Sequence, residues 1–263
     1  MNMPSRMEAE QWESLTKQFG LCAGPENDSG SSAVPAADLL DKAGCAAYLD
    51  ALTEKLGSPS RMATASMFAK RYAFLSVVPA LYAMTVFNKG IRFRLEHMLL
   101  DSASEPGKSW ISRARLTDYE VSEPAEGSRD AWREETVKAL FGGSIRTLWR
   151  VLSEVAHVPM AILWENTAVR VYSLYEKKIG AGDIPEEHGR IRDDYDYLIR
   201  KAAPALFGET YNPLARFYGQ DVHAVGASAP AAARVRTTCC FYYQVAANGE
   251  FCVACPKAKR RIT

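Results

Sequence analysis

Four of the six cysteines in this chain lie within seventeen residues near its C-terminal end. They are Cys239, Cys240, Cys252 and Cys255, spaced C-C-x11-C-x2-C. Two thiolates separated by two residues can grip one metal, and four thiolates suit either tetrahedral zinc or an iron–sulfur cluster. We therefore expect the tail to be organised around a metal centre. Cys22 and Cys45 are interpreted as buried free thiols, because Cys45 lies on the apolar stripe of a predicted helix.

The spacing leaves two kinds of metal centre open. Zinc sites usually pair two C-x-x-C knuckles, whereas Cys239 and Cys240 are adjacent. Neighbouring side chains in a strand point to opposite faces, so two vicinal thiolates meet one small ion awkwardly. A [2Fe–2S] centre has two irons and offers a wider target, which favours the cluster over zinc.

The overall composition is that of an ordinary folded protein. Among 263 residues, 48% are hydrophobic and 24% are charged, and the formal net charge is +1. This balance argues against a largely disordered chain and against a globally basic nucleic-acid binder, so no nucleic-acid partner is expected. The length predicts one large domain or two small ones.

Membrane insertion and export are not expected either. The uncharged run from Tyr72 to Phe87 is interrupted by Pro79 and is shorter than the roughly 20 apolar residues that a membrane span needs. The N-terminal residues lack the apolar core of a signal peptide. We therefore expect a cytoplasmic protein whose cysteines stay reduced unless they bind metal.

Hydrophobic periodicity predicts an α+β fold that is predominantly helical. A helical body is expected over residues 1–233, followed by a cysteine-rich segment over 234–263. Pro79 should kink or split one helix, and Gly142-Gly143 could break another. The predicted helices cover residues 7–21, 38–56, 61–87, 130–155, 160–179 and 185–206. Alternating residues at 91–100 and 110–121 predict a β-hairpin with one buried face.

Other chemical motifs are missing from the sequence. There is no phosphate-binding glycine loop, dinucleotide fingerprint, H-E-x-x-H zinc motif or G-x-S-x-G nucleophile elbow. The acidic run at 192–196 could suggest a divalent-metal site, but we interpret it as the solvated face of a charged helix.

The tail resembles a known family signature. Cys239-Cys240 followed by Cys252-Val-Ala-Cys255-Pro256 is similar to the C-terminal C-C…C-x-x-C-P pattern of siderophore-iron reductases of the FhuF type. Upstream, Leu163-Trp164-Glu165-Asn166 resembles the L-W-x-N stretch of that family, and the body is similar to a domain of siderophore synthetases. One departure is that eleven residues separate the vicinal pair from the third cysteine, where the family pattern has ten.

The resemblance implies a ferric-siderophore reductase. In that family the four tail cysteines hold a [2Fe–2S] cluster, which implies that Cys239, Cys240, Cys252 and Cys255 are its ligands here. The substrate would be a ferric siderophore, with hydroxamates favoured. No flavin or nicotinamide site is recognisable, so an external donor such as a ferredoxin, a flavoprotein or a small thiol or nicotinamide reductant would recharge the cluster.

Charge in the tail suits that interpretation. From residue 234 onward, the sequence contains six basic residues and one acidic residue. A positively charged surface there would attract an anionic siderophore or an acidic redox carrier. We expect Arg234, Arg236 and Lys257 among the substrate contacts. Two alternatives are a zinc-stabilised binding protein with a basic tail and a non-catalytic relative of the siderophore synthetases.

The tail also allows a prediction about its register. Residues 237–245 and 250–255 are expected to form two strands, and Asn248-Gly249 favours a tight hairpin turn. That turn would place Cys240 about 16 Å from the position opposite Cys252, at 3.3 Å per residue. Metal ligation should instead set Cys240 opposite Cys252 and Phe241 opposite Phe251, with a wider loop and positive φ at Gly249.

Overall fold

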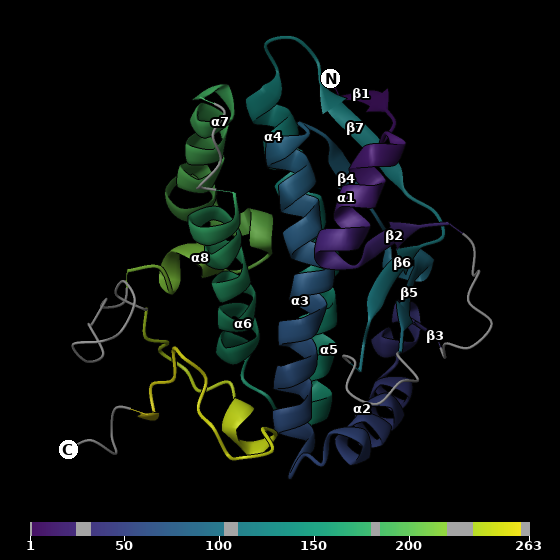
Figure 1. The fold of residues 1–263 in the computed structure, drawn as a ribbon, viewed down its shortest axis with the longest axis vertical. Coiled ribbons are helices and arrows are strands. Elements are labelled where there is room, and N and C mark those ends of the chain that lie inside the picture. Colours follow the sequence, from purple (N-terminus) through teal and green to yellow (C-terminus); the bar gives the residue numbers. More distant parts are fainter. Residues whose placement is uncertain (1, 25–32, 103–109, 180–184, 220–233, 259–263) are drawn as a thin grey trace.

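One long helix, α3 (Arg61–Val86), runs through the centre of the molecule, and the other elements pack around it (Figure 1). The computed structural model describes residues 2–24, 33–102, 110–179, 185–219 and 234–258. Most of α3 is buried, which accounts for its long uncharged run. Its most extensive partner is α6 (Met160–Ser173), which lies alongside it.

The body is predominantly helical, as the periodicity predicts, and several of its helices begin at side-chain caps. The Ser60 hydroxyl accepts a hydrogen bond from the amide of Ala63 at the start of α3, and Asp41 caps α2 in the same way. The remaining α-helices are α1 (Ala9–Phe19), α2 (Lys42–Leu56), α4 (Arg129–Lys138), α5 (Arg146–Ala156), α7 (Pro185–Asp196) and α8 (Pro213–Arg216). Short 3-10 turns are η1 (Ala36–Leu40), η2 (Leu95–His97), η6 (Pro204–Phe207) and η7 (Tyr242–Gln244).

The two predicted helix interruptions have different outcomes. Pro79 lies inside α3 without splitting it, because burial of the surrounding turns offsets a proline cost of about 3 kcal/mol. Gly142 and Gly143 lie in the π-helical segment η3 (Ala139–Ile145), which joins α4 to α5. A Cβ at Gly142 would lie 2.7 Å from the carbonyl oxygen of Leu206, so close packing, not a chain break, requires this glycine. Similar π-helical segments are η4 (Leu174–Lys178) and η5 (Tyr197–Lys201).

Two small sheets lie on one side of α3 (Figure 1). One has the order β1-β7-β4 and is antiparallel, and the other has the order β2-β6-β5-β3 with a parallel β2–β6 pair. The strands of the first sheet are β1 (Asn2–Ser5), β4 (Gly90–Arg92) and β7 (Glu120–Pro124). Those of the second are β2 (Leu21–Ala23), β3 (Ala33–Pro35), β5 (Met98–Asp101) and β6 (Arg113–Leu116). The α+β class is confirmed.

The hairpin predicted at 91–121 is only partly right. Its inner halves pair as expected, with Met98 opposite Leu116 and Asp101 opposite Arg113. The outer halves belong to the other sheet, where Ile91 is opposite Val121. The 3-10 turn η2 breaks the first alternating run, so one predicted strand becomes two strands in different sheets.

The acidic helix near residue 194 is not simply a solvated face, which corrects the prediction. Asp194 is fully buried and pairs with Arg129 at 2.7 Å and with Arg133 at 2.9 Å. The Thr85 hydroxyl of α3 donates to the same carboxylate. These contacts fasten α7 to α3 and α4, while the neighbouring Asp193 remains half-exposed.

In the described ranges, no helix is both long enough and apolar enough to cross a bilayer. The long helix α3 is instead covered by other parts of the fold, from α6 on one side to the two sheets on the other.

Candidate metal centre

The cysteine-rich tail is a compact irregular segment beside the N-terminal end of α3 and the lower end of α6 in Figure 1. The predicted strands at 237–245 and 250–255 are wrong. Phe241 has a left-handed φ of 61°, and the 3-10 turn η7 follows it directly. A single backbone hydrogen bond of 2.9 Å, from the Arg236 amide to the Ala254 carbonyl, joins the two ends of the segment.

The turns of the tail bring cysteines together by another route. The Gly249 amide donates to the Ala246 carbonyl, and Gly249 has the expected positive φ of 65°. The tight Asn248-Gly249 hairpin is therefore absent, and it is Tyr243, not Phe241, whose ring contacts Phe251. The Cys255 amide donates to the Cys252 carbonyl, which closes the C-x-x-C turn.

The thiols of Cys240 and Cys252 are in contact, with their sulfur atoms 3.7 Å apart. Two sulfur ligands of one tetrahedral metal lie about 3.8 Å apart when each bond is about 2.3 Å. This pair therefore has the spacing of two thiolates that share one metal, and the predicted juxtaposition of Cys240 and Cys252 is confirmed. Within the described residues, no three His, Cys, Asp or Glu side chains are grouped so as to hold a single ion.

Burial and charge differ among the tail cysteines. Cys240 is 1% exposed and Cys255 is 5% exposed, whereas Cys239 and Cys252 are half-buried. The hydrogen bond between the two thiols, helped by Arg236 and Lys70, lowers the pKa of Cys240 to about 5. The same hydrogen bond, together with burial, raises the pKa of Cys252. The metal-free site thus already favours one thiolate in a protein interior, which is the form that binds metal.

A buried carboxylate on α6 holds the start of the tail. Glu165 is 2% exposed, and its oxygens accept the backbone amides of Thr237 at 2.6 Å and Thr238 at 2.8 Å. The Thr238 hydroxyl also donates to it, and the guanidinium of Arg236 lies 3.5 Å away. Thr238 directly precedes Cys239, so Glu165 fixes the backbone from which the first two cysteines project. We call these four residues the Glu165 clamp.

A second contact fixes the vicinal pair from α3. The Ser66 hydroxyl donates to the Cys240 carbonyl at 2.9 Å. The Asn166 amide in turn donates to the Ser66 carbonyl and hydroxyl at 2.9 and 3.0 Å. All three residues are buried, so adjacent turns of α3 and α6 position Cys240 directly.

The three cations predicted to contact substrate have different surroundings. Arg236 is buried in the Glu165 clamp. Arg234 is half-buried, pairs with Glu176 at 2.5 Å and lies over the ring of Tyr218. Lys257 is exposed and donates to the Tyr243 hydroxyl at 3.1 Å. The structure therefore brings Arg236 to the cysteine site as an internal residue and leaves Lys257 on the outer rim.

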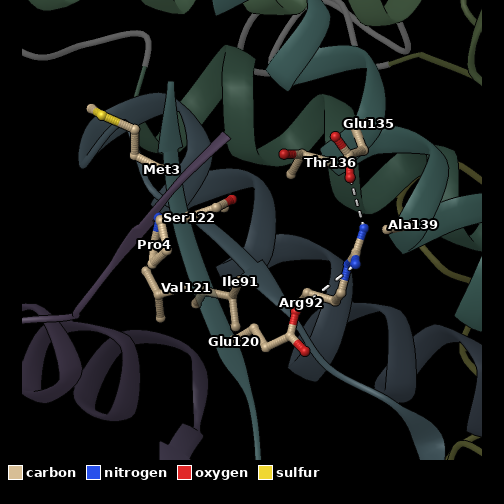
Figure 2. A pocket seen from close by; sticks show the side chains of 11 residues that line it. Met3, Pro4, Ile91, Arg92, Glu120, Val121, Ser122, Glu135, Thr136 and Ala139 are labelled. Atoms are coloured by element: carbon tan, nitrogen blue, oxygen red, sulfur yellow. Dashed lines mark hydrogen bonds and ion pairs between the residues drawn. The ribbon is translucent and has the colours of Figure 1, made fainter. Parts of the chain in front are cut away.

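A cavity of about 330 Å³ lies elsewhere, between the β1-β7-β4 sheet and α4 (Figure 2). Arg92 projects into it and pairs with Glu135 at 2.9 Å, with Glu120 at 3.9 Å on its other side. None of the residues that line the cavity belongs to the cysteine-rich tail, so it is separate from the metal centre.

Sequence reasoning missed Glu165, Ser66 and Lys70 as residues of the site. The signal for Glu165 was present, since a carboxylate that directly follows the apolar run Ile162-Leu163-Trp164 on a buried helix needs a partner. Ser66 carried no comparable signal. Its partner, the Cys240 carbonyl, lies 174 positions later in the chain.

Two family models match the chain. The model described as "Ferric iron reductase FhuF-like transporter" matches residues 66–240, and the "FhuF 2Fe-2S C-terminal domain" matches residues 236–257. The second match contains all four tail cysteines, so the chain carries a domain that binds a [2Fe–2S] cluster. No curated protein matches the chain.

Solved structures of larger proteins resemble the fold. The ATP-bound aerobactin synthetase IucA from a hypervirulent pathotype of Klebsiella pneumoniae has a TM-score of 0.53 and 11% identity, over 79% of this chain and 46% of the synthetase. The aerobactin synthetase IucC from the same source has a TM-score of 0.49 and 14% identity, over 72% and 36%. This chain spans less than half the length of either synthetase, and the likeness to IucA shows a shared fold alone.

Proposed function

This chain belongs to the FhuF-like family of ferric iron reductases, and we propose that it reduces ferric siderophores so that their iron is released as Fe(II). The observation that carries the proposal is the cysteine tail fastened to the body, with the Cys240 and Cys252 sulfurs 3.7 Å apart. Its predicted ligands, Cys239, Cys240, Cys252 and Cys255, would hold the [2Fe–2S] group, which supplies a one-electron carrier when bound.

The chain's own residues give the site a buried side and an open side. Cys240 and Cys255 are buried, Ser66 holds the Cys240 carbonyl, and the Glu165 clamp holds the backbone of Thr237 and Thr238. Val253 is 90% exposed between Cys252 and Cys255, so the C-x-x-C turn lies at the surface. An electron can therefore leave or enter across this turn without opening the fold.

The substrate class follows from the chemistry of iron ligands. Hydroxamate and catecholate oxygens are hard ligands that bind Fe(III) far more tightly than Fe(II). When Fe(III) gains one electron, the siderophore binds the resulting Fe(II) weakly and the ion dissociates. No covalent bond forms between the chain and the siderophore. Hydroxamates are the favoured class, and Lys257 on the exposed rim is the best placed of the three predicted cationic contacts.

An external protein or small reductant would complete the cycle by returning one electron. The candidate donors are a ferredoxin, a flavoprotein, or a small thiol or nicotinamide reductant. Such a donor would contact the exposed C-x-x-C turn and Lys257. A reducing compartment such as the cytoplasm would contain donors of this kind.

Anaerobic purification tests the proposal. The protein should be coloured, contain two irons and two sulfides per chain as a [2Fe–2S] centre requires, and bleach with dithionite. Cys240→Ser should lose the chromophore, and the matched control Cys45→Ser should keep it, because Cys45 is fully buried in the core away from the tail. A colourless protein with one zinc would contradict the proposal and favour the zinc-stabilised alternative.

A further inference from the structure

Two cations lie one helical turn beyond the residues that hold Cys240. Lys70 follows Ser66 by four positions on α3, and Arg170 follows Asn166 by four positions on α6, so each lies on the same face as its predecessor. The Arg170 guanidinium donates to the Lys70 carbonyl at 3.3 Å. The Lys70 ammonium lies 5.1 Å from the centre of the ring of Tyr242, which is two residues after Cys240. The two helices thus present a pair of positive charges beside the cysteine tail.

Neither cation takes part in any of the ion pairs formed among the described residues. Among the described residues, Arg170 contacts the Lys70 carbonyl and the ring of Phe74, and Lys70 contacts the ring of Tyr242. Both side chains belong to half-buried residues. Grouped, partly desolvated cations are costly unless an anion offsets them.

The groups that can supply this negative charge are the tail cysteines. Lys70 is one helical turn from Ser66, whose hydroxyl donates to the Cys240 carbonyl at 2.9 Å, and Arg170 is one turn from Asn166, whose amide donates to Ser66 at 3.0 Å. Four thiolates with two irons and two sulfides make an anionic centre, and reduction adds one more negative charge. A fixed cation therefore stabilises the reduced form more than the oxidised form.

We propose that Lys70 and Arg170 are positioning residues that act as counter-charges of the [2Fe–2S] cluster and raise its reduction potential. The inference rests on the proposed cluster ligands. Its consequence for the proposed function is that a milder donor can recharge the cluster, at the expense of driving force toward the ferric siderophore. The step itself is one electron added to the oxidised cluster, with no proton or bond change at either residue.

The test is a dithionite titration with redox dyes, without oxygen and without siderophore. The variants are Lys70→Gln, Arg170→Gln and the double variant, and Lys42→Gln is the control, because Lys42 is exposed and pairs with Glu154 on another face. Each single variant should lower the potential, and the double variant should reduce the equilibrium constant for cluster reduction about tenfold, which is 59 mV for one electron. Lys42→Gln should leave it unchanged.

Unchanged potentials in all three variants, at normal iron and sulfide content, would overturn the inference. Should the neutral variants fail to keep the cluster, Lys70→Arg and Lys70→Met decide the matter. If Lys70→Arg keeps the cluster and Lys70→Met loses it, the positive charge of residue 70 is required. If both variants lose the cluster equally, the inference is overturned. This titration contains no siderophore, so its result does not depend on the proposed function. If a separate assay showed no siderophore reduction, the proposed function would be rejected, and a shifted potential would still support this inference.

Discussion

Replacing Glu165 by Gln tests whether the body sets the shape of the cysteine tail. The carboxylate accepts the amides of Thr237 and Thr238 and lies beside the Arg236 guanidinium, and both charged side chains are 3% exposed. Gln keeps one acceptor oxygen but replaces the other with an NH2 group that faces donors. A charge-assisted hydrogen bond contributes about 1.5–3 kcal/mol, and removing one partner of a buried ion pair costs about 3–5 kcal/mol.

We therefore expect tail docking to weaken by about 3 kcal/mol, the lower end of that range. At about 1.4 kcal/mol per factor of ten, this is roughly a hundredfold increase in opening. Native-state hydrogen exchange of the Thr237 and Thr238 amides should accelerate by that factor, and a chelator should remove iron correspondingly faster. Glu165→Asp keeps the charge but is one methylene shorter, so its effect should be intermediate.

The matched control is Glu154→Gln, which removes a carboxylate from an exposed ion pair with Lys42. Neither amide exchange nor iron loss should change in that variant, because exposed pairs contribute little. Wild-type exchange rates at Thr237 and Thr238 in Glu165→Gln would refute the reasoning, since they would show that the tail holds its shape without the carboxylate.

Three further predictions concern the thiols and the core. In metal-free protein, the low pKa of Cys240 favours a thiolate near neutral pH, and its contribution to stability is present above the ordinary thiol pKa and declines as pH falls through about 5; ultraviolet thiolate titration of wild type against Cys240→Ser measures this, and identical curves would contradict it. Asp194→Asn should lower the free energy of unfolding in urea by about 3 kcal/mol, because it leaves Arg129 and Arg133 without a buried anion, whereas Asp193→Asn at the half-exposed neighbour should have a smaller effect. Ser66→Ala should speed chelator removal of iron without lowering the free energy of unfolding in urea by more than about 1 kcal/mol, and iron loss at the wild-type rate would argue against the Ser66 contact.

Local patterns in the sequence were sufficient to predict much of this molecule. The apolar stripe through Cys45, Leu49 and Leu52 forms the buried face of α2. The cysteine spacing predicted the metal-binding tail. The requirement that the cysteines bind one metal centre predicted that Cys240 and Cys252 lie close together. These features depend on residues that are close together in the chain.

Features that depend on distant partners could not be predicted in the same way. Residues 237–245 have strand propensity but do not form a strand. Their backbone makes hydrogen bonds with Glu165 and Ser66 in place of those between two hairpin strands. Asp194 looked solvated because its partners, Arg129 and Arg133, lie about 60 residues earlier. The pairing of β1 with β7 likewise joins the two ends of a long intervening segment, which residue alternation alone does not reveal.

The most direct measurement of the central claim is a single-turnover reaction without oxygen between the dithionite-reduced protein, freed of excess reductant, and a ferric trihydroxamate siderophore with an Fe(II) trap. We expect the cluster absorbance to return as the trap signal rises, with one Fe(II) formed per cluster reoxidised. A Cys240→Ser sample carried through the same steps should give only the background rate. Reoxidation of the wild-type protein at that background rate, with hydroxamate and catecholate complexes alike, would contradict the account.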